Sequence, residues 1–303
     1  ARGALHPRHR ARHARLHGRA AEPGAARLKT AAMELGEDFA RFIAPRAERL
    51  VALAGLLAAR DLPYSVLRTG AARHVAVRLG TGTPRLIMMA HYDRASGSPG
   101  VLDNSCACLE LADFAQRVTK MAPPVPSILV VFSDLEEAPG AGRATDQGAL
   151  ALARAILGSQ AVGDSPPPVL VLDVTGRGDR LLLSKAATDL LERAGRGASR
   201  TARAQQSLAA LCRNAARQAG LAEPLSLPLP WSDDLGLSLG GLAALTVSLL
   251  PEDEALSLAA SPGTVPETWA CLHSEDDSVD MVEASALGLV AALLDRMALL
   301  LRP

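Results

Sequence analysis

The sequence predicts a folded α/β domain, and three observations support this. The chain has 303 residues, of which 49% are hydrophobic and 21% charged, an ordinary composition for a globular protein. From Glu34 onward, segments with helical periodicity alternate with short strand-like segments, as in α/β proteins. Several of the short segments are continuously apolar, which is typical of strands buried on both faces. We therefore expect one large domain with a sheet between helices.

The elements follow from these patterns in chain order. Helical periodicity covers residues 34–60 and stops at Asp61-Leu62-Pro63. Two strands are expected next, near residues 64–68 and 74–78, joined as a hairpin across Thr69-Gly70. The continuous apolar runs predict further strands at residues 85–90, 127–132, 169–172 and 243–249. Helices are expected at residues 104–120, 147–157, 200–220 and 280–301.

Residues 1–32 differ from the rest of the chain in charge and pattern. They carry eight basic side chains against one acid, Glu22, and they lack helical or alternating apolar periodicity. We expect a basic, disordered or non-native N-terminal extension, followed by one domain over residues 33–303. A basic targeting arm is the alternative, but neither a Ser-rich transit peptide nor the apolar core of a secretory signal is present.

Charge and hydropathy exclude several functional classes. Residues 33–303 carry 24 basic and 31 acidic side chains, a net charge of −7, which disfavours nucleic-acid binding. The longest uncharged apolar stretch is shorter than the roughly 20 residues of a membrane-spanning helix. Four scattered cysteines predict free thiols. We expect a cytoplasmic protein, or a secreted one if the N-terminus is truncated; the sequence does not indicate an oligomeric state.

Three of the predicted buried strands are followed directly by side chains that can bind a metal. These are His91 with Asp93, then Glu136 with Glu137, and finally Asp173. Because ligands in open α/β sheets bind beyond the carboxyl ends of the strands, we expect these groups to converge.

Two more residues complete a predicted ligand set. Asp103 follows a Gly-rich loop, and His273 precedes the last helix. With His91, Glu137 and Asp173 they supply two imidazoles and three carboxylates, a mixture that suits zinc or a similar divalent ion. Five such ligands serve two ions if one carboxylate bridges them.

The same residues carry a family resemblance over residues 34–303. The segments AHYDRASGSPGVLDNS, SDLEEAPG, LDVTGRGD and HSEDDSVD resemble, in order, the motif series of the M28 (peptidase Y-type) zinc aminopeptidases. The resemblance implies a zinc-exopeptidase-like α/β/α sandwich (phosphorylase/hydrolase-like) with a mixed, mostly parallel sheet. It also implies an aminopeptidase that uses two zinc ions, or cobalt or manganese, on a peptide substrate.

Roles for individual residues also come from this resemblance. His91 and Asp173 would hold one ion, Glu137 and His273 the other, and Asp103 would bridge the two. Glu136 would be the general base, and Asp93 would orient His91 through its second ring nitrogen. Asp277 would support the loop that carries His273.

Substrate contacts are predicted from two further residues. Asp233, in the segment Trp231-Ser232-Asp233-Asp234, resembles a residue near the family's substrate pocket, although a capped helix start explains the same pattern. Trp269, four residues before His273, is expected either in a pocket wall or in core packing. One departure from the family is Leu272, which stands where some members have a tyrosine that steadies the oxyanion, so that partner is unassigned.

Each site residue, taken alone, also has a structural explanation. Asp103 is a good helix N-cap, the two glutamates complement a helix dipole, and His91 could be a satisfied core histidine. Their joint occurrence at successive strand ends favours a metal site.

Two other functions remain as alternatives. One is a glutaminyl-peptide cyclotransferase-like enzyme, in which a single zinc activates the acyl group and Glu136 shuttles protons. The other is a non-catalytic binding or scaffold domain, which predicts missing ligands. Metal stoichiometry separates the first alternative from the two-ion aminopeptidase.

Overall fold

An eight-stranded mixed sheet forms the centre of the computed structural model, which describes residues 35–137, 147–159, 166–197, 199–230 and 232–303. The strand order is β1-β2-β4-β3-β5-β8-β6-β7. The strands are β1 (Ser65–Thr69), β2 (Ala72–Leu79), β3 (Leu86–His91), β4 (Ile128–Ser133), β5 (Val169–Leu172), β6 (Arg180–Ser184), β7 (Leu225–Leu227) and β8 (Ala244–Leu250). The four central strands, β4, β3, β5 and β8, are mutually parallel.

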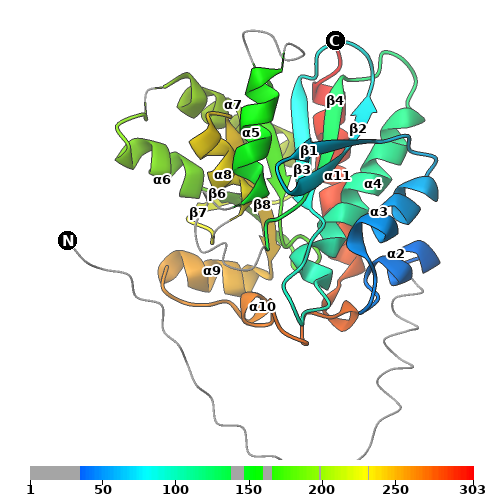
Figure 1. Ribbon diagram of the computed structural model, residues 1–303. Helices are drawn as coiled ribbons and strands as arrows, with labels where there is room; N and C mark the ends of the chain where they lie inside the picture. The colour runs from blue at the N-terminus through cyan, green and yellow to red at the C-terminus, as the bar shows by residue number, and fades with distance from the viewer. Residues whose placement is uncertain (1–34, 138–146, 160–165, 198, 231) are drawn as a thin grey trace, which may run out of the picture.

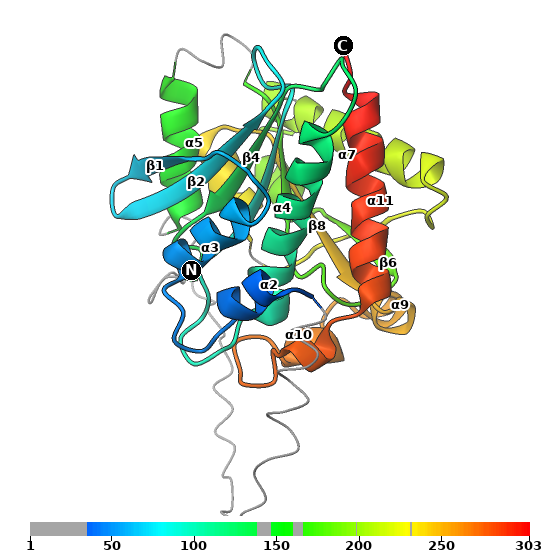
Figure 2. The same cartoon turned by 90° about the vertical axis from the view of Figure 1, so that its right-hand side faces the viewer.

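Helices cover both faces of this sheet (Figure 1). The first face packs against α4 (Cys106–Thr119), α7 (Arg200–Gln218) and α11 (Ala284–Leu300). The opposite face packs against α5 (Gly148–Gly158) and α8 (Asp233–Gly240). Figure 2 shows α4 and α11 side by side over their face of the sheet. The chain therefore has three layers, as the predicted α/β/α sandwich requires.

Alternation along the central strands explains the two apolar cores. In β3, Met88 and Ala90 belong to the core under α4 and α11, whereas Ile87 and Met89 belong to the core under α5 and α8. All six residues of β3 are buried. A strand covered on both faces needs apolar side chains at every position, which is why these segments appear in the sequence as continuous apolar runs.

The first predicted helix, over residues 34–60, is wrong as a single element. The structure has two helices, α2 (Glu37–Phe42) and α3 (Arg49–Ala58), with a turn between them. Pro45 lies in that turn, and proline cannot continue a helix hydrogen-bond ladder. The predicted helices at residues 104–120 and 280–301 also begin later, at Cys106 and Ala284.

Several short elements were not predicted from the sequence. They include β6, β7, α8, α6 (Ala186–Arg193), α9 (Glu252–Ala260), α10 (Glu267–Ala270) and η3 (Val279–Met281). Most are too short to show a clear period. The helices α9 and α10 lie at the end of the sheet opposite the C-terminus (Figure 1), and they cover the region where the predicted ligands lie.

Two simpler predictions can be compared with the structure, and a third cannot. All four cysteines are free. Among the described residues, no helix has the length and apolar character needed to cross a bilayer. The predicted extension at residues 1–32 lies outside the described residues.

Candidate metal centre

The predicted ligands come from five separate segments at one end of the sheet, and three of these segments are strand ends. His91 is the last residue of β3, and Glu136 and Glu137 follow the end of β4 at Ser133. Asp173 follows β5 directly. Because β3, β4 and β5 are adjacent and parallel, their carboxyl ends bring these residues to the same edge.

Asp103 and His273 reach this edge from loops. Asp103 lies in the irregular turn η1 (Val101–Ser105), where its φ of −115° and ψ of 82° are not helical. The N-cap of α4 is Ser105, so the alternative role of Asp103 as a helix N-cap is wrong. His273 lies between α10 and η3, with its side chain 60% exposed.

The carboxylate of Asp103 joins two groups of candidate ligands. Its Oδ1 atom lies 3.1 Å from Nε2 of His91, and its Oδ2 atom lies 3.0 Å from Nε2 of His273. Asp173 completes the first group, with Oδ1 3.7 Å from His91 Nε2. Glu137 completes the second, with Oε1 2.9 Å from His273 Nε2.

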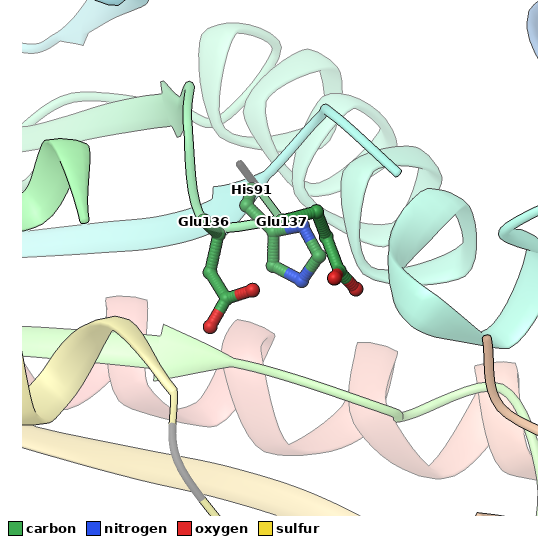
Figure 3. Close-up of side chains that lie close together, drawn as sticks. All are labelled: His91, Glu136 and Glu137. Carbon is green, nitrogen blue, oxygen red and sulfur yellow. The ribbon is translucent and has the colours of Figure 1, made fainter. Parts of the chain in front are cut away.

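These spacings suit a metal ion inside each group. Ligand atoms of one tetrahedral zinc are separated by about 3.4 Å when the bonds are about 2.0–2.2 Å long. Within each group the potential ligand atoms all lie within 4.8 Å of one another. A third combination, His91 with Glu136 and Glu137, meets the same limit, and Figure 3 shows the two glutamates on either side of the His91 ring.

Unpartnered polar atoms provide a test of whether a metal fits. Among the described residues, His91 Nε2, Glu137 Oε1 and Asp173 Oδ1 are buried without a hydrogen bond of acceptable geometry. Burying such atoms is costly unless something satisfies them. A divalent cation would satisfy all three, so the donor set fits zinc.

Without a metal, the charges around the site hold protons on the two imidazoles. The nearby carboxylates of Asp103 and Glu137 raise the pKa of His273 to about 10. Burial lowers the pKa of His91, but contacts with Asp103, Asp173 and Asp93 outweigh it and hold that pKa well above its usual value. A metal ion would displace these protons on binding.

Asp93 supports two neighbouring segments of the site. Its backbone oxygen lies 3.3 Å from Nδ1 of His91, whereas its carboxylate Oδ1 lies 3.6 Å from the same atom. The carboxylate accepts hydrogen bonds from the backbone N–H groups of Glu136 at 3.3 Å and Glu137 at 2.9 Å. Asp93 therefore ties the end of β3 to the loop that carries both glutamates.

Asp277 links the two loops that face each other across the site. Its Oδ1 atom accepts a hydrogen bond from the backbone N–H of Leu102 at 2.6 Å, and its Oδ2 atom accepts one from Asp103 at 3.3 Å. Burial raises the pKa of Asp277 to about 6. Because His273 lies on the same loop as Asp277, this contact sets the position of Asp103 relative to His273.

Unusual backbone conformations occur beside the ligands. Leu135 precedes Glu136 and has a φ of 64°, Val174 follows Asp173 with a φ of 52°, and His273 itself has a φ of 58°. Each such residue other than glycine costs on the order of 1–3 kcal/mol and persists only where surrounding contacts enforce it. These turns direct the ligands into the site at some expense in stability.

Glu136 lies within the ligand cluster and has one direct side-chain partner among the described residues. Gln147 Nε2 donates a 2.6 Å hydrogen bond to Glu136 Oε1. Burial raises the pKa of Glu136 well above its usual value, and His91 opposes this shift. Gln147 was not identified from the sequence, because a single glutamine at the start of a helix carries no recognisable pattern.

A pocket of about 760 Å³ opens over the predicted metal ligands. Its lining includes Asp103, Glu136, Glu137, Asp173 and His273, together with apolar residues of the loops around them. Trp269 and Leu272 are part of the wall, and Trp269 also packs against the apolar core, so both expectations for Trp269 apply. No lysine or arginine of the described residues lines this pocket.

The structure does not place Asp233 in the pocket wall. Asp233 is the first residue of α8 and is fully buried, where its Oδ2 atom accepts a 2.5 Å hydrogen bond from the Ser133 hydroxyl. Asp233 is therefore not among the residues that line the pocket, and a helix does start at this point, whereas its contact with substrate stays a prediction. Trp231 lies outside the described residues.

Solved structures share this fold over most of the chain. A Zn-dependent exopeptidase from Parabacteroides distasonis matches with a TM-score of 0.63 and 14% identity, over 89% of this chain and 97% of that chain. A glutaminyl cyclase from an Acidobacteriales bacterium matches with a TM-score of 0.61 and 20% identity, over 96% and 99%. A zinc aminopeptidase from Bacillus subtilis matches with a TM-score of 0.51 and 15% identity, over 74% of this chain and 49% of that chain.

Sequence comparison gives the family. No curated protein has a significant sequence match to this chain. The model of peptidase family M28 matches residues 74–297, a span that contains every predicted ligand. The chain therefore belongs to peptidase family M28.

Proposed function

We propose that this chain is a zinc aminopeptidase that removes N-terminal residues from peptides at a two-ion site. The observation that carries the proposal is the position of Asp103, whose two carboxylate oxygens reach His91 and His273 separately. One carboxylate between two ligand groups is the arrangement that a pair of ions about 3.5–4 Å apart requires. The similar exopeptidase from Parabacteroides distasonis is named as Zn-dependent, which supports zinc as the metal.

His91 and Asp173 would hold one ion, Glu137 and His273 the other, and Asp103 would contact both. Bound there, zinc supplies positive charge that polarises the scissile carbonyl and acidifies a water molecule. The protein's part is to keep these ligands in register, which Asp93 and Asp277 do through backbone hydrogen bonds.

Glu136 moves the proton. Because Gln147 donates to its Oε1 atom, Oε2 is the oxygen available to accept a proton from the attacking water and pass it to the leaving amine. A positioned base of this kind contributes roughly 10²–10⁴-fold to a rate. Trp269 and Leu272, in the pocket wall, would contact the peptide and limit access of bulk water.

The test combines metal analysis with a Glu136→Gln variant. Zinc-loaded protein is expected to contain two ions per chain and to release N-terminal amino acids from unblocked peptides. The variant should keep both ions and lose at least about 100-fold in kcat. Unchanged turnover in the variant would remove Glu136 from the mechanism, and one ion per chain would reject the two-ion site.

A glutaminyl cyclase is the second candidate, because the chain also matches a cyclase over its whole length. The chain covers 99% of the Acidobacteriales cyclase and 97% of the Parabacteroides exopeptidase, so length does not separate the two candidates. Cyclisation would convert N-terminal glutamine to a ring with release of ammonia, whereas hydrolysis releases a free amino acid. Mass spectrometry of peptides that begin with glutamine or leucine distinguishes the two reactions.

A further inference from the structure

Within the described part of the chain, the side-chain amide of Gln147 has a partner for its nitrogen and none for its oxygen. Its Nε2 atom donates to Glu136 Oε1 at 2.6 Å. Its Oε1 atom is buried without a hydrogen-bond partner among the described residues, and Gln147 is only 5% exposed while it lines the pocket. A buried amide oxygen of this kind calls for a donor.

The start of α5 holds this amide in place. The backbone N–H of Gly148 donates to the Leu135 carbonyl at 3.0 Å. A Cβ at Gly148 would lie 2.0 Å from the Asp134 carbonyl oxygen, so only glycine allows the helix to approach this closely. Glu136 follows Leu135 directly, and Gln147 precedes Gly148. The contact between Gly148 and Leu135 therefore fixes Gln147 and Glu136 side by side.

The chemistry of the pocket narrows the choice of donor. No lysine or arginine of the described chain lines it, so a donor for this oxygen has to come from the ligand, and an amide oxygen accepts from an amine but not from an anion. We propose that Gln147 recognises the free α-amino group of the peptide through Oε1 while Nε2 orients Glu136. This rests on the proposed function, since it assigns the group that marks a peptide's N-terminus.

The consequence is a link between recognition and catalysis. An amide is rigid, so an amine bound at Oε1 fixes the Nε2 atom that holds Glu136. Gln147 is thus a substrate-binding residue through one atom and a positioning residue for Glu136 through the other. A peptide with a blocked N-terminus would lack the donor and leave the buried oxygen unsatisfied.

The experiment compares two ligands that differ only in the amine. Leucine hydroxamate and 4-methylpentanohydroxamate are titrated into zinc-loaded protein by calorimetry, and the ratio of their Kd values measures the contribution of the amine. In Gln147→Met this ratio should fall at least about tenfold, the value of one hydrogen bond to a charged group. Gln218→Met, an exposed glutamine on α7, is the matched control and should leave the ratio unchanged.

A second variant separates the two roles. Gln147→Glu keeps an acceptor for the amine but loses the donor to Glu136, so the Kd ratio should persist while kcat falls at least about tenfold. An unchanged ratio in Gln147→Met with zinc content intact would overturn the amine contact. Wild-type kcat in Gln147→Glu would overturn the positioning of Glu136.

Further outcomes distinguish this inference from the proposed function. If Gln147→Met fails to fold or to load zinc, the shorter Gln147→Asn, which cannot span both contacts, replaces it with the same expected result. Hydrolysis and cyclisation both use a free α-amine. A wild-type protein that prefers the amine-bearing ligand but releases no amino acid from any peptide would therefore reject the aminopeptidase and retain the role of Gln147.

Discussion

Replacing His74 by asparagine should make the folded state less sensitive to acid. His74 is fully buried in β2, where Nδ1 accepts the Asp134 N–H at 3.2 Å and Nε2 lies 2.8 Å from the Thr69 hydroxyl. This arrangement requires a neutral ring, and burial lowers the pKa of His74 from 6.5 to about 4. Through Asp134 the ring also supports the segment that leads to Glu136.

The sign and size of the pH effect on stability follow from the lowered pKa of His74. A histidine whose folded pKa is lowered contributes stability that is fully present above pH 6.5 and is lost as pH falls towards 4. The shift from 6.5 to about 4 corresponds to a maximum loss of about 3 kcal/mol, of which about 2.5 kcal/mol appears between pH 7.5 and 4.5. His74→Asn keeps an acceptor for the Asp134 N–H and has no proton to gain.

Urea unfolding of metal-free protein at both pH values measures this difference. The wild type should lose about 2–3 kcal/mol more than His74→Asn between pH 7.5 and 4.5, whatever the variant costs at pH 7.5. Other titrating groups, including the two site histidines, cancel in the comparison. Equal losses in the two proteins would refute the assignment of a buried, neutral His74.

Three more predictions concern the site and its support. Asp277→Asn should weaken zinc binding by roughly 10- to 100-fold, because it weakens the acceptor that holds the backbone amides of Leu102 and Asp103. Competition with a chelator measures the zinc affinity, and wild-type affinity in the variant would contradict this prediction. Zinc binding should release protons at pH 7 and become tighter as the pH rises, because the pKa of His273 is raised to about 10. Calorimetry in buffers of different ionisation enthalpy measures the number of protons released, and His273→Ala should reduce that number. Arg49→Lys should lower the free energy of unfolding by about 3 kcal/mol, because the Arg49 guanidinium donates to three separate acceptors that one ammonium cannot span. Urea unfolding measures this loss, and a value below about 1 kcal/mol would show that these contacts contribute little.

The strands of the fold were predictable where both faces are buried. The segments that became β3, β4, β5 and β8 are apolar at nearly every position, and a local pattern suffices to identify them. The short elements β6 and β7 were not, because three to five residues carry too little pattern. The break between α2 and α3 was missed because apolar periodicity masked the turn at Pro45.

The structure brings together all five predicted ligands. Asp233, which was predicted near the substrate, lies instead in the interior. The convergence of His91, Glu137 and Asp173 was predictable because parallel strands of one sheet end at one edge. Asp103 and His273 reach the same edge from loops, which strand ends do not predict. Asp233 could not be placed in this way, since whether a residue at a helix start faces a pocket or a neighbouring strand depends on how the helix docks. Here the Asp233 carboxylate faces the end of β4, where the Ser133 hydroxyl donates a hydrogen bond to it.

By itself, the sequence determined the kind of fold and the set of groups available for metal binding, because both depend on residue type and local spacing. The position of Asp103 between the two imidazoles was implied by the family resemblance, whereas tertiary structure alone decided that Asp93 holds the backbone of the two glutamates and that Gln147 contacts Glu136. These contacts join segments whose separation depends on how loops and helices dock on the sheet. Differences of an ångström in that docking decide which atoms meet, and no local pattern encodes them.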